Sequence, residues 1–465
     1  MADTTYDFGL VGLGVMGRNF ILNVADNDFS AIGLDLDKEK VASLLEESGD
    51  KEVSATADKE KFVKALSKPR KIMLLVPAGK PVDGVISDLK PLLEAGDIII
   101  DGGNSFFTDT DRRFEELKRE GIHFFGAGVS GGAKGARRGP SIMPGGDREA
   151  YEYIKPVFEA AAAKVDGEPC VAHLGNGSAG NYVKMVHNGI EYAMMQMISE
   201  VYHLMKNGLG LSNDGLRLIF EDWNKSSLSS FLVEITAEIF AQKDEFTNGE
   251  LVDQILDKAK QKGTGKWTSQ NAMDLGVPIP VVDVSVSMRQ ISSFKDQRVR
   301  ADKQYDLAHA PLELTVDDMK SALHLCFILA YAQGFVQLKS ASEAYGYDLD
   351  MEVIAKIWRG GCIIRSGMLE DFRKAFDAEP TIDNILMSDV LVDQVKKQLP
   401  QLKKVVASAM TSGYPAPALS ASLNYFLAYT SGRLPLNLIQ AQRDHFGSHT
   451  YERIDREGIF HTDWD

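Results

Sequence analysis

The stretch "YDFGLVGLGVMGRNF", residues 6–20, sets the architecture of the first part of this chain. An apolar run precedes three spaced glycines, and a helical pattern follows them. In such a strand–turn–helix unit the first glycine permits the tight turn, the second lets a pyrophosphate approach the backbone, and the third lets helix and strand pack closely. The phosphates lie at the N-terminus of the helix. We therefore predict a Rossmann-type cofactor loop that comprises Gly12, Leu13, Gly14, Val15, Met16 and Gly17.

An acidic residue, Asp35, ends the next apolar run, "SAIGLDLD". A carboxylate at this distance from the glycines suits the ribose 2′-hydroxyl of NAD and repels the 2′-phosphate of NADP. Two alternatives remain open. Asp35 could merely start a turn or cap the helix expected from Lys38, or Lys38 and Lys40 could attract a 2′-phosphate. The prediction is NAD as the preferred cofactor, with NADP as the alternative.

Up to residue 178, the sequence alternates short apolar runs with amphipathic stretches. The expected strands are "YDFGLVGLG", "SAIGLDLD", "KIMLLVPA", "DIIIDGGNS" and "HFFGAGVSGG", and helical segments such as "KEKVASLLEES" and "TDTDRRFEELKREG" lie between them. This alternation predicts a parallel, doubly wound sheet that binds ligands at the C-terminal ends of its strands. Residues 1–178 are thus predicted to form a dinucleotide-binding domain.

Beyond residue 178 the strand signals fade and helical patterns dominate. Two stretches about 136 positions apart look alike, "GLSNDGLRLIFEDW" from Gly210 and "GYDLDMEVIAKIW" from Gly346. The same offset places "KMVHNGIEYAMMQM" over "KSALHLCFILAYAQ". We predict a duplicated all-helical domain over 179–435; the alternative is that any two amphipathic helices align this well. The polar, aromatic residues 436–465 are expected to form a tail that docks on something.

Composition narrows the function classes. A chain of 465 residues is expected to hold two or three domains, and its net charge of −15 argues against a generally basic nucleic-acid-binding surface. Its three cysteines are scattered, so neither a disulfide framework nor a zinc site is expected, and no metal is predicted. The N-terminus lacks a secretory pattern, and no uncharged apolar run approaches ~20 residues. We expect a soluble, cytoplasmic protein without a membrane span.

The stretch "KMVHNGIEY", residues 184–192, carries an unusual stripe. Lys184, His187, Asn188 and Glu191 fall on one face of a helix whose other positions are apolar. Taken alone, His187 reads as a satisfied core histidine. Together, the four groups would need a buried ionic network with no other use, so we interpret them as a catalytic stripe.

Four further segments offer candidate binding groups. "DGGNS" and "GVSGG" each follow an expected strand, "QKGTGKWT" is a glycine-spaced loop suited to cradle a phosphate, and "VSVSMRQISSF" carries an arginine that would be costly to bury unpaired. The structural alternative is that the loops are plain turns and the arginine pairs with a carboxylate. The candidate residues are Asn104, Ser130, Gly131, Gly132, Lys262, Thr264, Lys266 and Arg289.

These segments, in this order, resemble one family. "GLGVMGRN", "DGGNS", "GVSGG", "GARRGPSIMPGG", "KMVHNGIEY", "FEDWNK", "QKGTGKWT" and "NLIQAQRDHFGSHTY" are similar to the motifs of decarboxylating 6-phosphogluconate dehydrogenases. The resemblance covers essentially the whole chain. It implies oxidation of 6-phosphogluconate at C3, loss of CO2 and release of ribulose 5-phosphate.

The resemblance also implies roles for the stripe. Lys184 would be the general base that takes the C3 hydroxyl proton and then steadies the enolate oxygen, so it must bind substrate in its neutral form. Glu191 would protonate C1 of the enediol. Seven residues separate the two, roughly 10 Å along a helix, which suits groups acting on different carbons.

The remaining roles implied by the resemblance concern binding and assembly. Arg443 and His449 of the tail would complete the substrate site of a neighbouring subunit, which implies a homodimer. Asn104, Ser130, Gly131, Gly132, His187 and Asn188 would bind the carboxylate and hydroxyl groups, Tyr192, Lys262, Thr264 and Arg289 would bind the 6-phosphate, and Val76 and Asn104 would join the cofactor site.

The sequence departs from the family pattern at two points. Members that use NADP typically carry Asn-Arg-Thr where this chain has Asp35-Leu36-Asp37, which favours NAD here, or at least a relaxed cofactor preference. After "GVSGG" the family often has two acidic residues, whereas this chain has Ala133 and Lys134. Two other functions stay open: a related β-hydroxyacid dehydrogenase that acts on a smaller substrate, and a catalytically silent nucleotide-binding protein.

Overall fold

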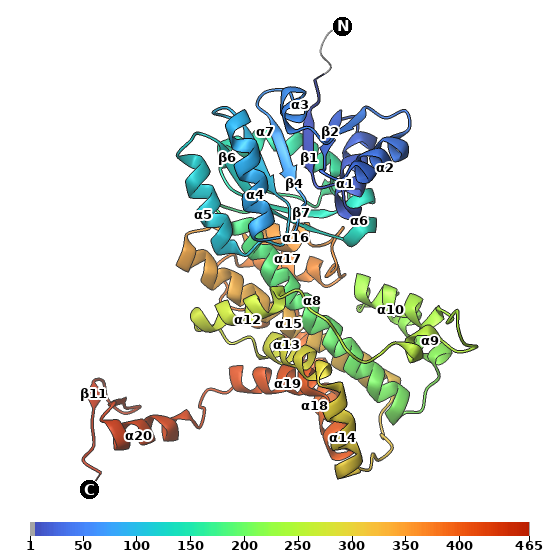
Figure 1. The fold of residues 1–465 in the computed structure, drawn as a ribbon. Coiled ribbons are helices and arrows are strands. Elements are labelled where there is room, and N and C mark those ends of the chain that lie inside the picture. The colour runs from blue at the N-terminus through green and yellow to red at the C-terminus, as the bar shows by residue number, and fades with distance from the viewer. Residues whose placement is uncertain (1–4, 465) are drawn as a thin grey trace.

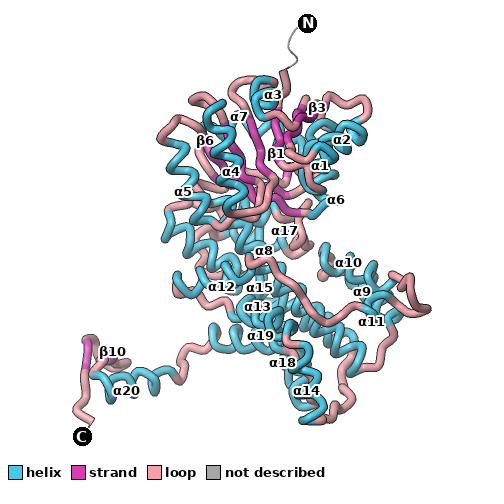
Figure 2. The backbone as a smooth tube through the Cα atoms, in the orientation of Figure 1, coloured by secondary structure: helices cyan, strands magenta, loops and turns pink. Residues whose placement is uncertain are grey.

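The computed structural model describes residues 5–464. An α/β domain forms one end of the molecule, and an elongated body of helices extends from it (Figure 1). After the last body helix the chain leaves as an arm that ends in a small helix and hairpin, apart from the rest (Figures 1 and 2).

The N-terminal domain is built on a seven-stranded sheet in the order β3-β2-β1-β4-β5-β6-β7. The first six strands are parallel, which confirms the predicted doubly wound fold, while β7 runs antiparallel to β6. Only ten residues join β6 to β7, too few for the crossover that a parallel neighbour needs. The strands are β1 (Phe8–Val11), β2 (Ala31–Leu34), β3 (Val53–Thr56), β4 (Lys71–Leu74), β5 (Ile98–Asp101), β6 (His123–Ser130) and β7 (Ser141–Gly145).

Helices cover both faces of this sheet. α1, α6 and α7 pack together on one face, and α3, α4 and α5 contribute apolar side chains to the core on the other. The short hairpin β8 (Lys164–Val165) and β9 (Glu168–Pro169) then leads out of the domain. The helices are α1 (Val15–Asp26), α2 (Lys38–Ser48), α3 (Lys59–Lys64), α4 (Lys80–Leu89), α5 (Phe107–Lys118), α6 (Gly132–Arg138) and α7 (Arg148–Ala161).

The helical domain contains two similar units. Each begins with a long buried helix, α8 (Ala179–His203) or α15 (Val316–Tyr345), and then turns at a left-handed glycine, Gly210 or Gly346. A capped short helix follows in both, α9 (Asn213–Trp223) or α16 (Met351–Ile357), and a buried tryptophan lies at its end. This correspondence supports the predicted duplication.

The rest of each unit also corresponds. α10 packs on α9 as α17 packs on α16; α12 and α13 pack back on α8 as α18 and α19 pack on α15, and α13 meets α19. The two long helices cross at the centre. The bounds are α10 (Phe231–Ala241), α11 (Leu251–Gln254), α12 (Thr264–Asp274), α13 (Pro280–Ser293), α14 (Lys295–Tyr305), α17 (Leu369–Ala378), α18 (Asp389–Thr411) and α19 (Pro417–Tyr429).

Helix α15 corrects one expectation from the sequence. By length and composition this helix is apolar enough to cross a membrane. No apolar run of such a length was expected from the sequence. Within the fold, 89% of its most apolar stretch is buried, because α8, α18 and α19 pack around it. Its hydrophobicity is that of a central core helix.

The arm follows α19 and consists of α20 (Leu436–Gly447) and a hairpin of β10 (Tyr451–Glu452) with β11 (Ile459–Phe460). Most of its side chains are exposed, including Phe446 at 74% and Ile454 at 88%. An arm with so much exposed apolar surface is typical of a segment that packs against another surface.

Candidate active site

The glycine loop after β1 has the geometry of a dinucleotide cradle. Gly12 has a φ of +98°, and a Cβ there would lie 2.5 Å from the carbonyl oxygen of Leu75. A Cβ on Gly17 would lie 1.9 Å from the carbonyl oxygen of Gly12, so helix and loop touch. Gly14 is the N-cap of α1, has no side-chain cap and has nothing within 4 Å of its Cβ position. The open N-terminus of α1 therefore fits a pyrophosphate.

Asp35 lies at the adjoining strand end, where its carboxylate contacts this loop. The backbone N–H of Leu13 donates to its Oδ2 over 2.8 Å, and Lys40 Nζ lies 3.7 Å from the same oxygen. Lys40 also lies 3.8 Å from Asp37, and it is Asp37 that caps α2. Asp35 Oδ1 accepts from the backbone N–H of Asp37 over 3.0 Å, as at the start of a turn, but Asp35 does not cap α2. The two carboxylates share one lysine at the position expected for the adenosine ribose.

A buried arginine that the sequence did not single out organises the neighbouring loops. Arg113 on α5 is 1% exposed and donates to the carbonyl oxygen of Gly79, to Asp83 and to Asp101. Asp101 in turn accepts from the N–H of Gly103 over 3.0 Å and from the hydroxyl of Ser105 over 2.6 Å. This network fixes the loop that exposes Asn104 at the sheet edge. Its sequence signal was weak because "TDTDRRFEELK" reads as an ordinary surface helix.

The N-terminal part of α8 runs directly beneath β6 and β7. A Cβ on Gly128 would lie 2.3 Å from Cβ of Lys184, and one on Gly180 would lie 2.2 Å from the carbonyl oxygens of Gly126 and Met143. Only glycines permit this approach. The close crossing brings the stripe of α8 to the C-terminal end of β6.

Three of the four stripe residues are buried there, and the fourth is half-buried. Lys184 is 6% exposed, His187 is fully buried and Asn188 is 7% exposed. His187 Nε2 lies 3.1 Å from Ser130 Oγ, and its Nδ1 lies 3.1 Å from Asn188 Oδ1 and 3.5 Å from Lys184 Nζ. A neutral imidazole with its proton on Nδ1 can donate to Asn188 Oδ1 and can accept at Nε2 from the hydroxyl of Ser130.

Burial shifts each titratable member of the stripe toward its neutral form. Desolvation lowers the pKa of Lys184, although Glu191 and Cys362 oppose this electrostatically. Desolvation and the nearby Lys184 lower the pKa of His187 well below its usual value. Desolvation raises the pKa of Glu191 against the pull of Lys184 and Arg289. The stripe thus combines an amine with a lowered pKa and a carboxyl with a raised pKa, because burial disfavours the charged form of each.

Two of the phosphate-binding candidates differ from the interpretation of the sequence. Arg289 is not buried: it lies on α13 and stacks on the buried ring of Tyr192 at 4.4 Å, a cation–π contact. The "QKGTGKWT" segment is not a loop throughout, because α12 begins at Thr264 behind a left-handed Gly263. The phosphate candidate is therefore a helix N-terminus with no side-chain cap, flanked by the exposed Lys262.

The segment after α16 completes the floor of the site and was missed in the sequence. The N–H of Ile363 donates to Ser130 Oγ over 3.3 Å, and Trp358 packs edge-on against His187 at 5.8 Å. A Cβ on Gly131 would lie 2.6 Å from the carbonyl oxygen of Gly361. The Gly-Gly pair in "WRGGCII" was the available signal. The second helical unit thus supports the stripe of the first.

The two tail candidates, Arg443 and His449, lie elsewhere. Both are exposed on the arm, and Arg443 donates to Gln440 of the same helix over 3.1 Å. Figure 1 shows the arm pointing away from the body that carries α8. Within one chain, over residues 5–464, the structure does not bring these two residues to the stripe.

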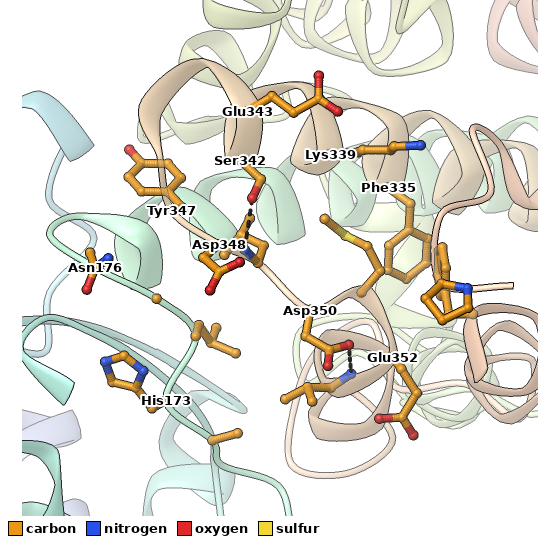
Figure 3. A pocket seen from close by; sticks show the side chains of 18 of the residues that line it. His173, Asn176, Phe335, Lys339, Ser342, Glu343, Tyr347, Asp348, Asp350 and Glu352 are labelled. Carbon is orange, nitrogen blue, oxygen red and sulfur yellow. Dashed lines mark hydrogen bonds between the residues drawn. The ribbon is translucent and has the colours of Figure 1, made fainter. Parts of the chain in front are cut away.

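A separate cavity of about 1180 Å³ contains none of the candidate residues (Figure 3). It lies between α7 and the α15–α16 junction, and its lining carries Glu343, Asp348, Asp350 and Glu352 among other acids. Such a lining would repel a phosphorylated sugar acid. The candidate site is therefore the stripe and not this cavity.

A Rossmann-type domain that packs, at β6 and β7, against a helix carrying a buried lysine and a half-buried carboxyl is typical of an NAD(P)-binding oxidoreductase. The comparisons with known proteins make this more specific. Residues 7–175 match the family described as the NAD binding domain of 6-phosphogluconate dehydrogenase, and residues 180–464 match its C-terminal domain. The chain belongs to the 6-phosphogluconate dehydrogenase family.

Individual relatives agree over nearly the full length. The chain is 50% identical to the NADP(+)-dependent decarboxylating 6-phosphogluconate dehydrogenase of Bacillus subtilis and 46% identical to the NAD(+)-dependent one of the same organism, with 98% of each chain covered. Among solved structures, 6-phosphogluconate dehydrogenase of Plasmodium falciparum matches with a TM-score of 0.95 at 43% identity, over 98% of this chain and 100% of that one.

Proposed function

We propose that this protein oxidises 6-phosphogluconate at C3 and decarboxylates the product to ribulose 5-phosphate, with NAD or NADP as hydride acceptor. The observation that carries the proposal is the stripe of α8, where burial favours a neutral Lys184 and a protonated Glu191 on one helix face. Relatives of 46–50% identity that bear this activity in their names support it.

The residues of the sheet edge fit the cofactor. Gly12, Gly14 and Gly17 and the free N–H groups of α1 would hold the pyrophosphate, and Asp35 would face the adenosine ribose. Val76 and Asn104, after the two neighbouring strands, would line the route toward Lys184. When bound, the nicotinamide supplies the site that accepts the hydride.

Lys184 then acts first as base and later as acid. Its neutral amine takes the proton of the C3 hydroxyl as the ketone forms. The ketone draws the electron pair left by CO2, and protonated Lys184 stabilises the developing enolate oxygen. Lys184 then gives its proton to that oxygen. Glu191 delivers its own proton to C1 of the enediol while the neutral Lys184 takes back the enol proton, which leaves the ketone of ribulose 5-phosphate. A neutral His187 bonded to Ser130 adds no positive charge that would oppose protonation of the lysine.

The polar groups around the stripe suit the rest of the substrate. Ser130, Asn188 and the backbone N–H groups of Gly131 and Gly132 would bind the carboxylate and hydroxyls, with Asn104 and His187. Arg289 on Tyr192, Lys262 and the N-terminus of α12 at Thr264 offer three kinds of phosphate contact: a guanidinium, an ammonium and backbone N–H groups.

NAD is the proposed preferred cofactor. Asp35 and Asp37 carry two negative charges against one lysine, Lys40, within 4 Å, so a 2′-phosphate would meet a net negative surface. NADP remains a usable alternative, because relatives named for each cofactor lie at similar identity.

We further propose a cytoplasmic homodimer in which each arm reaches the other subunit. The exposed apolar side chains of the arm and its separation from the body support this assembly. Arg443 and His449 would then enter the partner's substrate site, where the guanidinium of Arg443 would add positive charge beside the substrate phosphate.

The test is turnover of the purified protein on 6-phosphogluconate with NAD and with NADP in parallel, measuring both reduced cofactor and CO2. One CO2 per reduced cofactor is expected, with the larger kcat/KM for NAD. Lys184→Met should abolish turnover while NADH binding persists. Reduced cofactor without CO2 would favour a simple β-hydroxyacid dehydrogenase, and no turnover on any hydroxyacid would favour a silent nucleotide-binding protein.

A further inference from the structure

The arm contains a single fully buried side chain among its described residues 436–464, and that side chain is a carboxylate. Asp444, near the end of α20, is 0% exposed, whereas the residues on either side of it are exposed. A charged group is seldom buried in so thin a segment unless it is fully hydrogen-bonded.

Four donors converge on this carboxylate. Oδ1 accepts from the backbone N–H of Thr450 over 2.9 Å and lies 2.8 Å from His461 Nδ1. Oδ2 accepts from the backbone N–H of Thr462 over 3.1 Å and from the indole N–H of Trp464 over 2.9 Å. The donors come from the turn after α20 and from the last residues of the arm. The side chain of Asp444 therefore links α20 to the turn that follows it and to the residues after β11.

The bond to Thr450 fixes an unusual backbone. Thr450 is β-branched yet has a φ of +59°, and Ser448, which ends α20, has a φ of +50°. A β-branched residue in the left-handed region is strained, and such residues persist only where their surroundings hold them. The residue between these two is His449.

The ring of His449 is oriented by the same turn. A Cβ on Gly447 would lie 2.7 Å from His449 Nε2, so the imidazole lies over a position that only glycine leaves open. Phe446 packs edge-on against it at 5.9 Å. Arg443 directly precedes Asp444 on α20. Arg443 and His449 are the two residues proposed to reach the partner's substrate. The hydrogen bonds of Asp444 thus fix the backbone that carries both of them.

We infer that Asp444 is a positioning residue for the substrate site of the partner subunit, which it serves by fixing Arg443 and His449 relative to each other. This inference rests on the proposed arm exchange. Asp444 itself touches no substrate in this scheme. All four hydrogen bonds of its carboxylate are to residues of the arm. Its effect on substrate binding must therefore be transmitted through the backbone of residues 443–450.

The first test replaces one acceptor with a donor. In Asp444→Asn the amide can satisfy at most two of the four donors, so the turn at His449 loosens. We expect the KM for 6-phosphogluconate to rise at least about tenfold, with the KM for the dinucleotide nearly unchanged. Asp455→Asn is the matched control, since Asp455 pairs with Arg453 and Arg456 on the surface of the same arm. An unchanged KM in Asp444→Asn would overturn the inference.

A double-mutant cycle separates positioning from general loss of the arm. In the Arg443→Ala/His449→Ala background, Asp444→Asn should add little to the rise in KM, because the groups that it positions are gone. Fully additive effects would overturn the inference. If Arg443→Ala and His449→Ala themselves leave KM unchanged, the proposed arm exchange fails and the role of Asp444 fails with it.

Mixed dimers keep the test decisive even if the variant arm unfolds. Subunits with Asp444→Asn, which retain Lys184, are co-expressed with Lys184→Met subunits, which retain an intact arm, and the mixed dimers are purified by two tags. The active site of the first subunit should recover the wild-type KM, since it receives the intact arm. A KM that stays at the value of the Asp444→Asn homodimer would contradict the inference.

Discussion

At the scale of single residues, the site depends on two groups whose charged forms are disfavoured by burial. A free lysine would be charged at neutral pH and a free glutamate ionised, but desolvation on α8 disfavours both ions. Lys184 and Glu191 lie on the same helix face, so each also feels the other's charge. Their titrations are therefore coupled, and the pH profile reports the pair.

Replacing Glu191 tests this pairing. Activity needs Glu191 protonated, so it should fall as pH rises through the raised pKa of Glu191, and it should also fall at low pH as Lys184 gains its proton. We expect Glu191→Gln to lower kcat by about 10²- to 10⁴-fold and to abolish the alkaline limb of its pH profile. A retained alkaline limb would assign that limb to another group. Glu238→Gln, at an exposed position on α10, is the control.

Lys40 should tune the cofactor preference. It lies within 4 Å of both Asp35 and Asp37, and its removal leaves two unneutralised carboxylates beside the ribose. We expect Lys40→Ala to lower kcat/KM for NADP by about fivefold and to change that for NAD less, as for a solvent-exposed charge pair. Parallel kinetics with Lys38→Ala decide between the two lysines. A larger effect at Lys38 would identify that residue as the attraction for a 2′-phosphate.

At the scale of elements, α8 does more than carry the stripe. Farther along it, Glu200 is 3% exposed and accepts from the N–H groups of Ala418 and Leu419 at the start of α19, with one bond from Gln196. Burial raises the pKa of Glu200 to about 7, although these hydrogen bonds act in the opposite direction. The first helical unit is thus joined to the second, and to the helix from which the arm departs, by a carboxyl that titrates near neutrality.

This junction predicts a pH-dependent stability. Because the folded pKa of Glu200 lies above its usual value of 4.5, its contribution is fully present below that value and is lost as pH rises through about 7. The wild type should lose on the order of 3 kcal/mol from this group between pH 4.5 and 8. Thermal unfolding at several pH values should show a flatter dependence in Glu200→Gln. An unchanged slope would mean that the junction stays ionised.

At the scale of the whole molecule, the two domains divide the work. The cofactor loop lies within the Rossmann-type domain, the stripe lies on the first helix of the second, and glycines at 126, 128, 145 and 180 let the two meet at backbone distance. The second helical unit supports the stripe through the contacts of Trp358 with His187 and of Ile363 with Ser130. The arm lies apart from the candidate site of its own chain. Binding of cofactor and binding of substrate should therefore be separable.

Removal of the arm tests that division. A chain ending at Thr430 keeps every residue of the cofactor site, so NADH binding measured by fluorescence should stay within about twofold of the wild type. We expect kcat/KM for 6-phosphogluconate to fall by at least about 100-fold, since a positively charged part of the proposed site is missing. A truncated protein with normal substrate kinetics would refute a role of the arm in the site.

What the sequence alone determined is the set of local patterns. The glycine loop, the five apolar strands and the polar stripe on an apolar helix each follow from periodicity over a few residues, and the structure has those strands and helices where the patterns predict them. Two strands of the sheet, β3 and β7, were missed. β3, "VSAT", carries no apolar run, and the antiparallel direction of β7 follows from the short connection after β6.

Tertiary structure alone decided the environment of those residues. Burial beneath β6 shifts the pKa values of Lys184 and Glu191. Arg113 bonds to Gly79, 34 residues before it, and Asp444 accepts from Trp464, 20 residues after it. Arg289, which lies on an apolar stretch of sequence, is half-buried and stacks on the ring of Tyr192 of α8. Protonation and orientation depend on desolvation and on distant partners, and these arise only when the chain packs.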